Sequence, residues 1–336
     1  MHNVTLIKGD GIGPSIMEVA VNVINASGVK INWEEADAGL AAIEKYGTPI
    51  PDATLASIEK NRIAFKGPLT TPVGKGFRSI NVALRQQYDL YANVRPAKTW
   101  KGAQTRYENV DIVVVRENTE GLYAGIEHYL TKEKDMAESI ALVTRKSCER
   151  IVEYAFQYAK ANGRKKVTAC HKANILKFSS GLFLDVAKEV AARHPEIEFN
   201  EVIVDAACMH LVMNPQKFDV IVTTNMFGDI VSDLTAGLVG GLGLIPGANI
   251  GADAALFEAV HGSAPDIAGK NIANPTAVIM AGVMMLHHLG EHSAAQRIQD
   301  AVEKVVSESQ FVTPDLNPNS NTGTIEMGEA IIAAMH

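Results

Sequence analysis

The centre of the chain reads Phe218-Asp-Val-Ile-Val-Thr-Thr-Asn-Met-Phe-Gly-Asp-Ile-Val-Ser-Asp233, which predicts a strand, a short turn and a helix. The same alternation recurs elsewhere. A helix is expected from about Pro14 to Ala26, and apolar strand-like runs occupy residues 4–7, 112–115, 167–170, 202–204 and 220–223. Strands that alternate with helices in this way predict an α/β fold.

Two carboxylates on the predicted helix of this segment indicate a metal site. Asp229 and Asp233 are four residues apart and share one helix face, where like charges repel by roughly 0.2 to 0.5 kcal/mol. A divalent cation would compensate for this repulsion, and oxygen ligands suit Mg²⁺ or Mn²⁺. The alternative is that both side chains only favour the positive end of the helix dipole, which fits Asp229 well and Asp233 less well.

A second group of polar residues lies between residues 79 and 95. Asn81 and Arg85 share a face of a predicted helix, Ser79 precedes them, and Arg95 follows a strand-like run. Guanidinium groups bind carboxylates through paired hydrogen bonds, so this group predicts a site for a small acid with several carboxylates. A solvated amphipathic helix is the alternative that this segment alone leaves open.

Charged residues also follow several predicted strands. Arg95, Arg116, Lys172 and Asp205 each come where an apolar run ends. Ligands of α/β proteins bind outside the carboxyl ends of strands. A single charged residue at a strand end usually only reaches water, but four with matched chemistry favour a shared site.

Glycine-rich segments mark several turns. Gly9-Asp-Gly-Ile-Gly-Pro14 follows a strand and opens a helix, but its spacing differs from the Gly-x-Gly-x-x-Gly of dinucleotide-binding proteins, which argues against a standard Rossmann fold. Residues 237–251 and 257–269 are also rich in glycine and lack the Lys-Ser or Lys-Thr ending of a nucleoside triphosphate loop. These segments fit ligand-facing loops and structural turns equally well.

The composition limits the classes of function. At 336 residues the chain is long enough for two domains. The net charge of −7, with scattered basic residues, argues against a nucleic-acid surface. The three cysteines have no metal-site or disulfide spacing, and no targeting leader is recognised, so we expect a cytoplasmic protein with reduced thiols. The longest apolar stretch is too short for a bilayer, which takes about 20 residues, so no membrane span is expected.

Taken together, these motifs resemble the β-decarboxylating dehydrogenases, the family of isocitrate, isopropylmalate and homoisocitrate dehydrogenases. The resemblance runs nearly end to end, from the Gly9 turn through the Asn225–Asp233 signature to His261-Gly-Ser-Ala-Pro265. Within it, Ser79-Ile-Asn81-Val-Ala-Leu-Arg85 and Arg116-Glu-Asn-Thr-Glu-Gly-Leu-Tyr123 are similar to the isocitrate branch. The isopropylmalate branch presents an apolar residue to its substrate where this chain carries Ser79 and Asn81.

The resemblance implies a role for each motif. It implies that three arginines hold substrate carboxylates, namely Arg85, Arg95 and Arg116, and that Ser79 and Asn81 bind the third carboxylate of isocitrate. It implies metal ligation by Asp229 and Asp233, with Asp205 from a second subunit. The acid–base pair would be Tyr123 and Lys172, the latter also from the partner. The implied cofactor residues are Lys66, Thr71, Glu258, His261, Gly262, Ala264, Asp266, Ile267 and Asn274.

The implied reaction is the metal-dependent oxidative decarboxylation of isocitrate to 2-oxoglutarate and CO₂, with hydride transfer to NAD. NADP-dependent relatives carry Lys and Tyr where this chain has Asp266 and Ile267. A carboxylate at that place hydrogen-bonds a free ribose diol and repels a 2′-phosphate, which favours NAD. The alternatives are a homoisocitrate or isopropylmalate dehydrogenase, a regulatory subunit of a hetero-oligomer, and a metal- and acid-binding module without turnover.

The family fold has two α/β domains and is not a standard Rossmann fold. The resemblance implies that residues 1–90 and 240–336 form a large cofactor-binding domain. Residues 91–239 would form a small dimerisation domain, with a clasp at about 121–144. Because active sites in the family are shared between subunits, we expect a homodimer, or a higher oligomer, and an inactive monomer.

Overall fold

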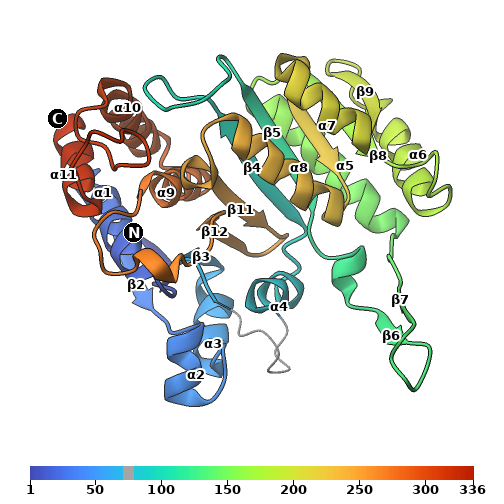
Figure 1. Ribbon diagram of the computed structural model, residues 1–336, viewed down its shortest axis with the longest axis horizontal. Helices are drawn as coiled ribbons and strands as arrows, with labels where there is room; N and C mark the ends of the chain where they lie inside the picture. The colour runs from blue at the N-terminus through green and yellow to red at the C-terminus, as the bar shows by residue number, and fades with distance from the viewer. Residues whose placement is uncertain (71–78) are drawn as a thin grey trace.

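A ten-stranded mixed sheet forms the centre of the protein in a computed structural model that describes residues 1–70 and 79–336 (Figure 1). From one edge to the other, the strands are β2 (Ile31–Glu35), β1 (His2–Ile7), β3 (Ile63–Lys66), β12 (Ala255–Ala259), β11 (Pro246–Ile250), β4 (Ala92–Lys98), β5 (Asp111–Glu117), β10 (Val220–Thr223), β8 (Lys166–His171) and β9 (Glu198–Ile203). The first five strands come from residues 1–66 and 246–259, and the last five from residues 92–223. This order is compatible with the two expected domains, whose boundary remains a prediction.

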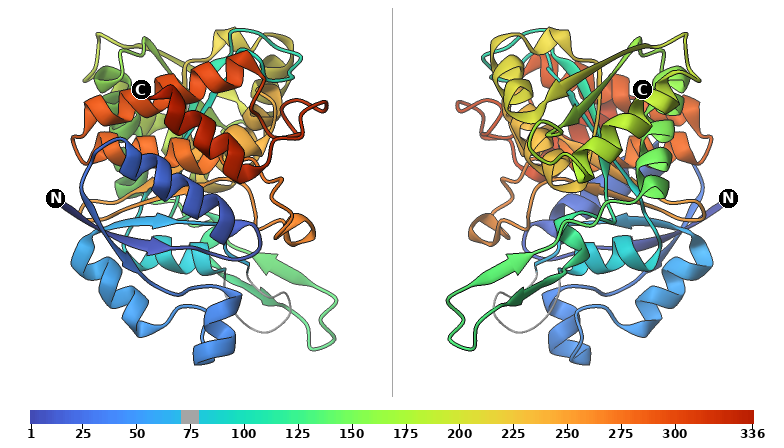
Figure 2. Two further views of the ribbon diagram at one scale, coloured as in Figure 1. Left: turned by 90° about the vertical axis from the view of Figure 1, so that its left-hand side faces the viewer. Right: turned by 90° about the vertical axis from the view of Figure 1, so that its right-hand side faces the viewer.

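Helices cover both faces of the sheet (Figures 1 and 2). They are α1 (Gly13–Ala26), α2 (Leu40–Tyr46), α3 (Asp52–Asn61), α4 (Ile80–Gln87), α5 (Arg145–Ala161), α6 (Ser179–Ala191), α7 (Val204–Met213), α8 (Asn225–Leu238), α9 (Thr276–His288), α10 (His292–Glu308) and α11 (Thr324–Ala334). The predicted α/β class is therefore confirmed, as are the helix at residues 14–26 and the strand–turn–helix at residues 218–233.

Antiparallel pairing at the centre of the sheet separates this fold from a standard Rossmann fold. Three neighbouring pairs are antiparallel, namely β12–β11, β11–β4 and β4–β5. All pairs toward the two edges of the sheet are parallel. A standard dinucleotide-binding sheet is mostly parallel. The rejection based on the glycine spacing is thus confirmed by the strand directions.

The two faces of β5 belong to different hydrophobic cores. Val113 and Val115 are buried in the core that also contains residues of α5 and α9, whereas Ile112 and Val114 are buried with residues of α7 and α8. Successive strand residues point to opposite faces, so this strand is buried on both sides. Apolar runs without alternation, such as residues 112–115, reflect this double coverage.

Two predicted strand ends were wrong. Arg95 lies inside β4, which continues through Pro96 to Lys98, and Arg116 lies inside β5. The ladder between β11 and β4 covers Ala92 to Val94 only, so the missing N–H of Pro96 costs no hydrogen bond on that side. Val204 and Asp205 belong to the first turn of α7, where the carboxylate is favoured by the helix dipole.

A two-stranded ribbon extends from the body of the protein within residues 121–144 (Figure 2). It pairs β6 (Glu127–Tyr129) with β7 (Ala137–Ser139) in antiparallel register, and all six residues are exposed. The ribbon lies where the clasp is expected. Among the described residues, no helix is long and apolar enough to cross a membrane.

Candidate active site

A polar cavity of about 220 Å³ lies over the centre of the sheet. It is lined by residues of α4, β4, β5, α8 and the loop after β12, including Ser79, Asn81, Arg85, Arg95, Arg116, Tyr123 and Asp229. All seven were singled out from the sequence. The structure therefore brings the predicted acid-binding residues together with one predicted metal ligand and one predicted catalytic residue.

Arg116 is the most deeply buried of the three arginines, with 1% of its surface exposed. Its Nε and Nη2 atoms donate to Asn225 Oδ1 at 3.0 and 2.7 Å, and Nη1 donates to Asp229. Gly228 permits this arrangement, because a Cβ atom there would lie 2.5 Å from Arg116 Cγ. Burial, followed by the nearby charge of Arg95, lowers the pKa of Arg116 to about 10, so the guanidinium stays charged at neutral pH.

Arg95 connects the two predicted metal ligands on α8. Its Nη1 atom donates to Ser232 Oγ at 2.6 Å and lies 3.5 Å from Oδ1 of both Asp229 and Asp233. Burial lowers the pKa of Arg95, and the positive charge of Arg85 lowers it further. Both carboxylates therefore converge on one point at the edge of the cavity.

This pair of carboxylates fits a hard divalent cation. Asp229 and Asp233 supply oxygen ligands from successive turns of one helix face, and their side chains remain 37% and 58% exposed. Burial raises the pKa of Asp229, but the charge of Arg116 and a hydrogen bond from Tyr123 outweigh it and lower that pKa, so the carboxylate is ionised. No group of three His, Cys, Asp or Glu residues suited to a metal exists among residues 1–70 and 79–336.

Tyr123 lies between the cavity and α8. Its hydroxyl donates to Asp229 Oδ2, and the Arg116 guanidinium lies 5.0 Å from the centre of its ring. Burial and the hydrogen bond to Asp229 raise the pKa of Tyr123. The phenol therefore holds its proton at neutral pH, as a general acid must.

The expected catalytic pair, Lys172 and Asp205, lies outside this cavity. Lys172 Nζ contacts Asp205 Oδ1 at 2.7 Å, and the Asp205 side chain is 70% exposed. The hydrogen bond from Lys172 lowers the pKa of Asp205. Neither residue lines the cavity that contains Tyr123 and Asp229, so a single chain does not bring the predicted acid and base together.

The predicted cofactor residues divide into two groups. Four of them line the same cavity, namely Lys66, Glu258, His261 and Gly262. The others lie on the following loop, where Ala264 has a left-handed φ of 38°, Asp266 is exposed, and Asn274 donates to Asp315 Oδ2 at 2.9 Å. Ile267 lies on the same loop in a short 3₁₀ turn, and Thr71 lies outside the described residues. The cofactor roles of these residues remain predictions.

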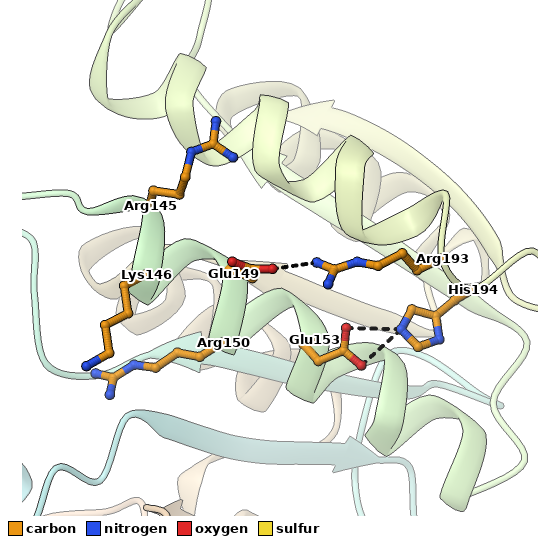
Figure 3. A pocket seen from close by; sticks show the side chains of 7 residues that line it. All are labelled: Arg145, Lys146, Glu149, Arg150, Glu153, Arg193 and His194. Atoms are coloured by element: carbon orange, nitrogen blue, oxygen red, sulfur yellow. Dashed lines mark hydrogen bonds and ion pairs between the residues drawn. The ribbon is translucent and has the colours of Figure 1, made fainter.

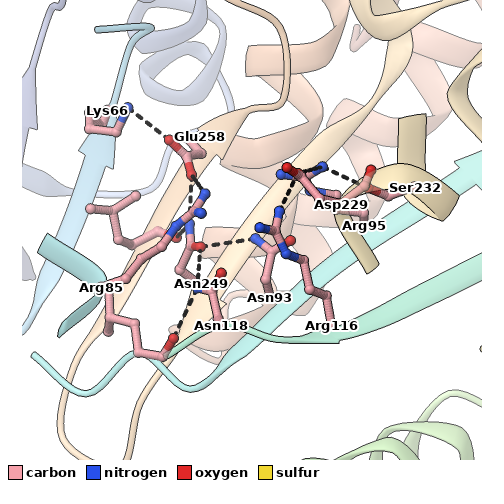
Figure 4. Close-up of polar contacts among 12 residues, drawn as sticks. Lys66, Arg85, Asn93, Arg95, Arg116, Asn118, Asp229, Ser232, Asn249 and Glu258 are labelled. Atoms are coloured by element: carbon pink, nitrogen blue, oxygen red, sulfur yellow. Dashed lines mark hydrogen bonds and ion pairs between the residues drawn. The ribbon is translucent and has the colours of Figure 1, made fainter. Parts of the chain in front are cut away.

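Glu258 forms a buried ion pair with Lys66 (Figure 4). Its Oε2 atom contacts Lys66 Nζ at 2.8 Å, and its Oε1 atom lies 3.4 Å from Arg85 Nη2. Burial alone would raise the pKa of Glu258, but the charges of Lys66 and Arg85 outweigh it and lower the pKa to about 2. Burial also lowers the pKa of His261, which is therefore neutral at pH 7.

Several polar residues of the site were not predicted. They are Asn93, Asn118, Asn225, Ser232 and Asn249, which bind the arginines or Glu258 either directly or through one another. Asn93 precedes Arg95 by two residues on one strand, so strand periodicity could have placed both on the same face. The partners that connect Asn249 to this face are up to 156 residues away in sequence, and no local signal reveals them.

A second, shallower hollow of about 740 Å³ lies over α5 and the end of α6 (Figure 3). Its three arginines, Arg145, Arg150 and Arg193, are already paired with carboxylates of the protein. Arg193 contacts Glu149 at 2.9 Å, and His194 contacts Glu153 at 3.1 Å. The predicted residues do not meet here, so we place the candidate active site in the smaller, polar cavity.

Comparison with known proteins identifies the family of this chain. Residues 3–331 match the isocitrate/isopropylmalate dehydrogenase family, and the chain belongs to that family. A crystal structure of isocitrate dehydrogenase from Methylococcus capsulatus is 64% identical, covers 100% of this chain and 99% of its own, and superposes with a TM-score of 0.97.

Curated relatives fall into both branches of the family. Isocitrate dehydrogenase [NAD] catalytic subunit 6, mitochondrial, from Arabidopsis thaliana is 51% identical over 95% of this chain and 85% of its own length. The 3-isopropylmalate dehydrogenase of Archaeoglobus fulgidus is also 51% identical, over 96% of both chains. Overall identity therefore defines the family but does not distinguish isocitrate from isopropylmalate as the substrate, so the residues of the cavity have to be considered.

Proposed function

We propose that this enzyme oxidises isocitrate with NAD and releases 2-oxoglutarate and CO₂. The observation that carries the proposal is the charge of the site. Four cations, Lys66, Arg85, Arg95 and Arg116, face three carboxylates, Glu258, Asp229 and Asp233, which leaves one positive charge. A divalent cation would raise this to three, which equals the negative charge of isocitrate at neutral pH.

Ser79 and Asn81 support isocitrate over isopropylmalate. Both line the cavity at the start of α4. A hydroxyl and an amide can donate to a third carboxylate. An isopropyl group at the same place would cover these polar groups without pairing them, which costs about 1 to 3 kcal/mol for each group that it buries.

The bound cofactors supply two parts of the chemistry. A divalent cation held by Asp229 and Asp233 would polarise the oxygens of the substrate, and NAD would accept the hydride. The arginines hold the carboxylates so that the reacting bonds are aligned. Lys172 of the partner subunit, with Asp205 beside it, takes the proton of the substrate hydroxyl. After CO₂ leaves, the Tyr123 hydroxyl donates a proton to carbon 3.

We further propose that the active unit is a homodimer formed by residues 91–239. Large apolar side chains are exposed on α7, on α8 and in the loop before α6, including Met213 at 73%, Ile230 at 54% and Phe178 at 93%. Exposed apolar patches of this kind are typical of protein interfaces. A partner that covers them would also supply the Lys172–Asp205 pair. The cytoplasmic location stays a prediction.

One spectrophotometric assay tests the proposal. NADH absorbance is followed after isocitrate, homoisocitrate or isopropylmalate is added with NAD and Mg²⁺ or Mn²⁺, with and without a chelator. We expect turnover of isocitrate that the chelator abolishes and excess metal restores. Absence of turnover with isocitrate, or faster turnover of isopropylmalate, would reject the assignment.

A further inference from the structure

A row of buried amide side chains lies beneath the acid-binding residues (Figure 4). Asn249 of β11 is directly opposite Asn93 of β4, and Asn93 is directly opposite Arg116 of β5. Residues paired in this way lie on the same face of the sheet. Asn249 is 0% exposed and Asn93 is 1% exposed, so the row is closed to solvent.

The orientation of the Asn249 amide is determined by its neighbours. Its Nδ2 atom donates to Glu258 Oε1 at 2.8 Å, since an ionised carboxylate can only accept. Its Oδ1 atom accepts from Asn93 Nδ2 at 2.9 Å and from Asn118 Nδ2 at 3.0 Å. Two donors on one side and a carboxylate on the other hold this side chain in a single position.

Asn249 and Arg85 compete for the same oxygen atom. Arg85 Nη2 is 3.4 Å from Glu258 Oε1, which is long for a charge-assisted hydrogen bond of about 2.7 to 2.9 Å. The Asn249 contact to that oxygen is 0.6 Å shorter, as the distances of 3.4 and 2.8 Å show. The Lys66 ammonium occupies the other oxygen, so both strong positions on the carboxylate are taken.

We propose that Asn249 is a positioning residue of the acid-binding site. By occupying Glu258 Oε1, it keeps the Arg85 guanidinium from closing onto that carboxylate and leaves Arg85 available to the substrate. This inference rests on the proposed function, because it assumes that Arg85 binds a substrate carboxylate. Asn249 touches neither the substrate cavity nor the reacting atoms, so its effect passes through Glu258 and Arg85.

Loss of the Asn249 amide has a defined consequence. Without it, Arg85 forms a closer pair with Glu258, and the substrate has to break that pair when it binds. Substrate binding weakens, whereas Tyr123, Asp229 and the Lys172–Asp205 pair keep their places. The KM for isocitrate therefore rises while kcat changes little, which is the signature of lost ground-state binding.

A double-mutant cycle tests this coupling. Asn249→Leu, which approximately conserves volume, is made in the wild-type enzyme and in the Glu258→Gln variant. We expect the KM for isocitrate to rise about tenfold in the first case and less than about twofold in the second, because a glutamine lacks the negative charge that draws Arg85 onto Glu258. Equal changes in both backgrounds would show a purely structural role and would overturn the proposal.

Two controls accompany the cycle. Thr168→Val removes another buried polar atom from the same sheet, outside the site, and should leave the KM unchanged. Thermal unfolding of each variant identifies those that fail to fold, and Asn249→Ser replaces Asn249→Leu if the leucine is not accommodated. A fall in kcat with an unchanged KM would contradict the proposal.

A non-reactive acid separates this inference from the proposed reaction. Tricarballylate has three carboxylates but no hydroxyl to oxidise, and its dissociation constant is measured by calorimetry on the metal-loaded protein. Weaker binding to Asn249→Leu only when Glu258 is present supports the positioning role even if isocitrate is not turned over. Equal affinity for wild type and Asn249→Leu overturns that role even if isocitrate is the substrate.

Discussion

The acid-binding cavity and the Lys172–Asp205 pair differ in how far one chain completes them. In the cavity, Arg85, Arg95 and Arg116 pair with Glu258, Asp229 and Asp233. Arg116 is 1% exposed, and Glu258 binds three partners. Lys172 and Asp205 contact each other at 2.7 Å, and Asp205 is largely exposed. The cavity is thus preorganised to bind, whereas the outer pair needs another surface to act upon.

This difference suggests a division of the reaction between subunits. If one chain holds the substrate acid, the cofactor and part of the metal site, that chain can bind substrate without a partner. The proton acceptor for the hydroxyl comes from elsewhere if Lys172 serves as the base. Catalysis would then require the dimer, whereas most contacts to the substrate would already exist within one chain.

The largest effect on activity is expected when the cavity and the Lys172–Asp205 pair are inactivated in different chains. Lys172→Ala and Asp229→Ala should each reduce activity by roughly a thousandfold or more, since one removes the base and the other a metal ligand. Mixed and re-equilibrated, the two variants should recover about a quarter of wild-type activity, because half of the dimers in a symmetric exchange are mixed and each of those contains one intact site.

Steady-state rates after refolding the mixture together measure this recovery. A mixture of Lys172→Ala with a second preparation of Lys172→Ala is the matched control. If the true mixture is as inactive as its parents, the base and the metal ligands belong to one chain.

Arg116→Lys should reduce kcat/KM for isocitrate by roughly 100- to 1000-fold. A lysine keeps the charge but cannot reproduce the paired bonds to Asn225 and Asp229 that the guanidinium makes. Steady-state kinetics measure the loss. Arg145→Lys is a control at an exposed ion pair over α5, where less than a twofold change is expected. Comparable losses in both variants would argue against the cavity as the active site.

The buried carboxylate of Glu258 should stay ionised at a lower pH than an exposed glutamate does. The pKa of Glu258 is lowered from 4.5 to about 2, so its ionised form adds about 3 kcal/mol of stability. A depressed pKa means that this stability is complete above about pH 4.5 and is lost as the pH falls toward 2.

Urea unfolding of wild type and Glu258→Gln from pH 7 to pH 3 measures this linkage. The difference in unfolding free energy should be largest near neutral pH and shrink below pH 4.5. A difference that is constant with pH would mean that Glu258 is not ionised in the folded protein.

Ser79→Leu should shift the preference among acids. An apolar side chain at the start of α4 removes a donor for the third carboxylate, so kcat/KM for isocitrate should fall roughly 10- to 100-fold, whereas isopropylmalate should lose less or gain. Competition assays with both acids measure the ratio. Ser293→Leu, at an exposed position of α10, is the control, and an unchanged ratio in Ser79→Leu would reject the selectivity role.

The smallest effect is expected for the preference between NAD and NADP. Asp266→Lys with Ile267→Tyr should lower the preference for NAD over NADP by roughly tenfold, because a cation there attracts the 2′-phosphate that a carboxylate repels. Kinetics with both cofactors measure the ratio. Asp253→Lys makes the same charge change on a different loop, and equal ratios in the two variants would indicate only a general charge effect.

Sequence patterns located most of the cavity because its residues lie on short, regular segments. Asn81 and Arg85 share a helix face, and so do Asp229 and Asp233, since helical spacing depends only on neighbours in the chain. The same reasoning failed at Arg95, where Pro96 was expected to end the strand. The strand continues because the ladder to β11 ends at Val94, so Pro96 needs no hydrogen-bond donor on that side. The strand before Asp205 was expected to include Val204, but it ends at Ile203, and Val204 begins α7.

By itself, the sequence determined the α/β alternation, the shared helix faces and the family to which the chain belongs, because these depend on local periodicity and motif chemistry. Only the tertiary structure decided which charges meet. Arg116 binds Asp229 across 113 residues, and Arg85 shares Glu258 with Asn249 across 173 residues. Such contacts depend on strand order and register, which no local pattern specifies. The position of Asn249 and the separation of Lys172 from Tyr123 follow from that topology.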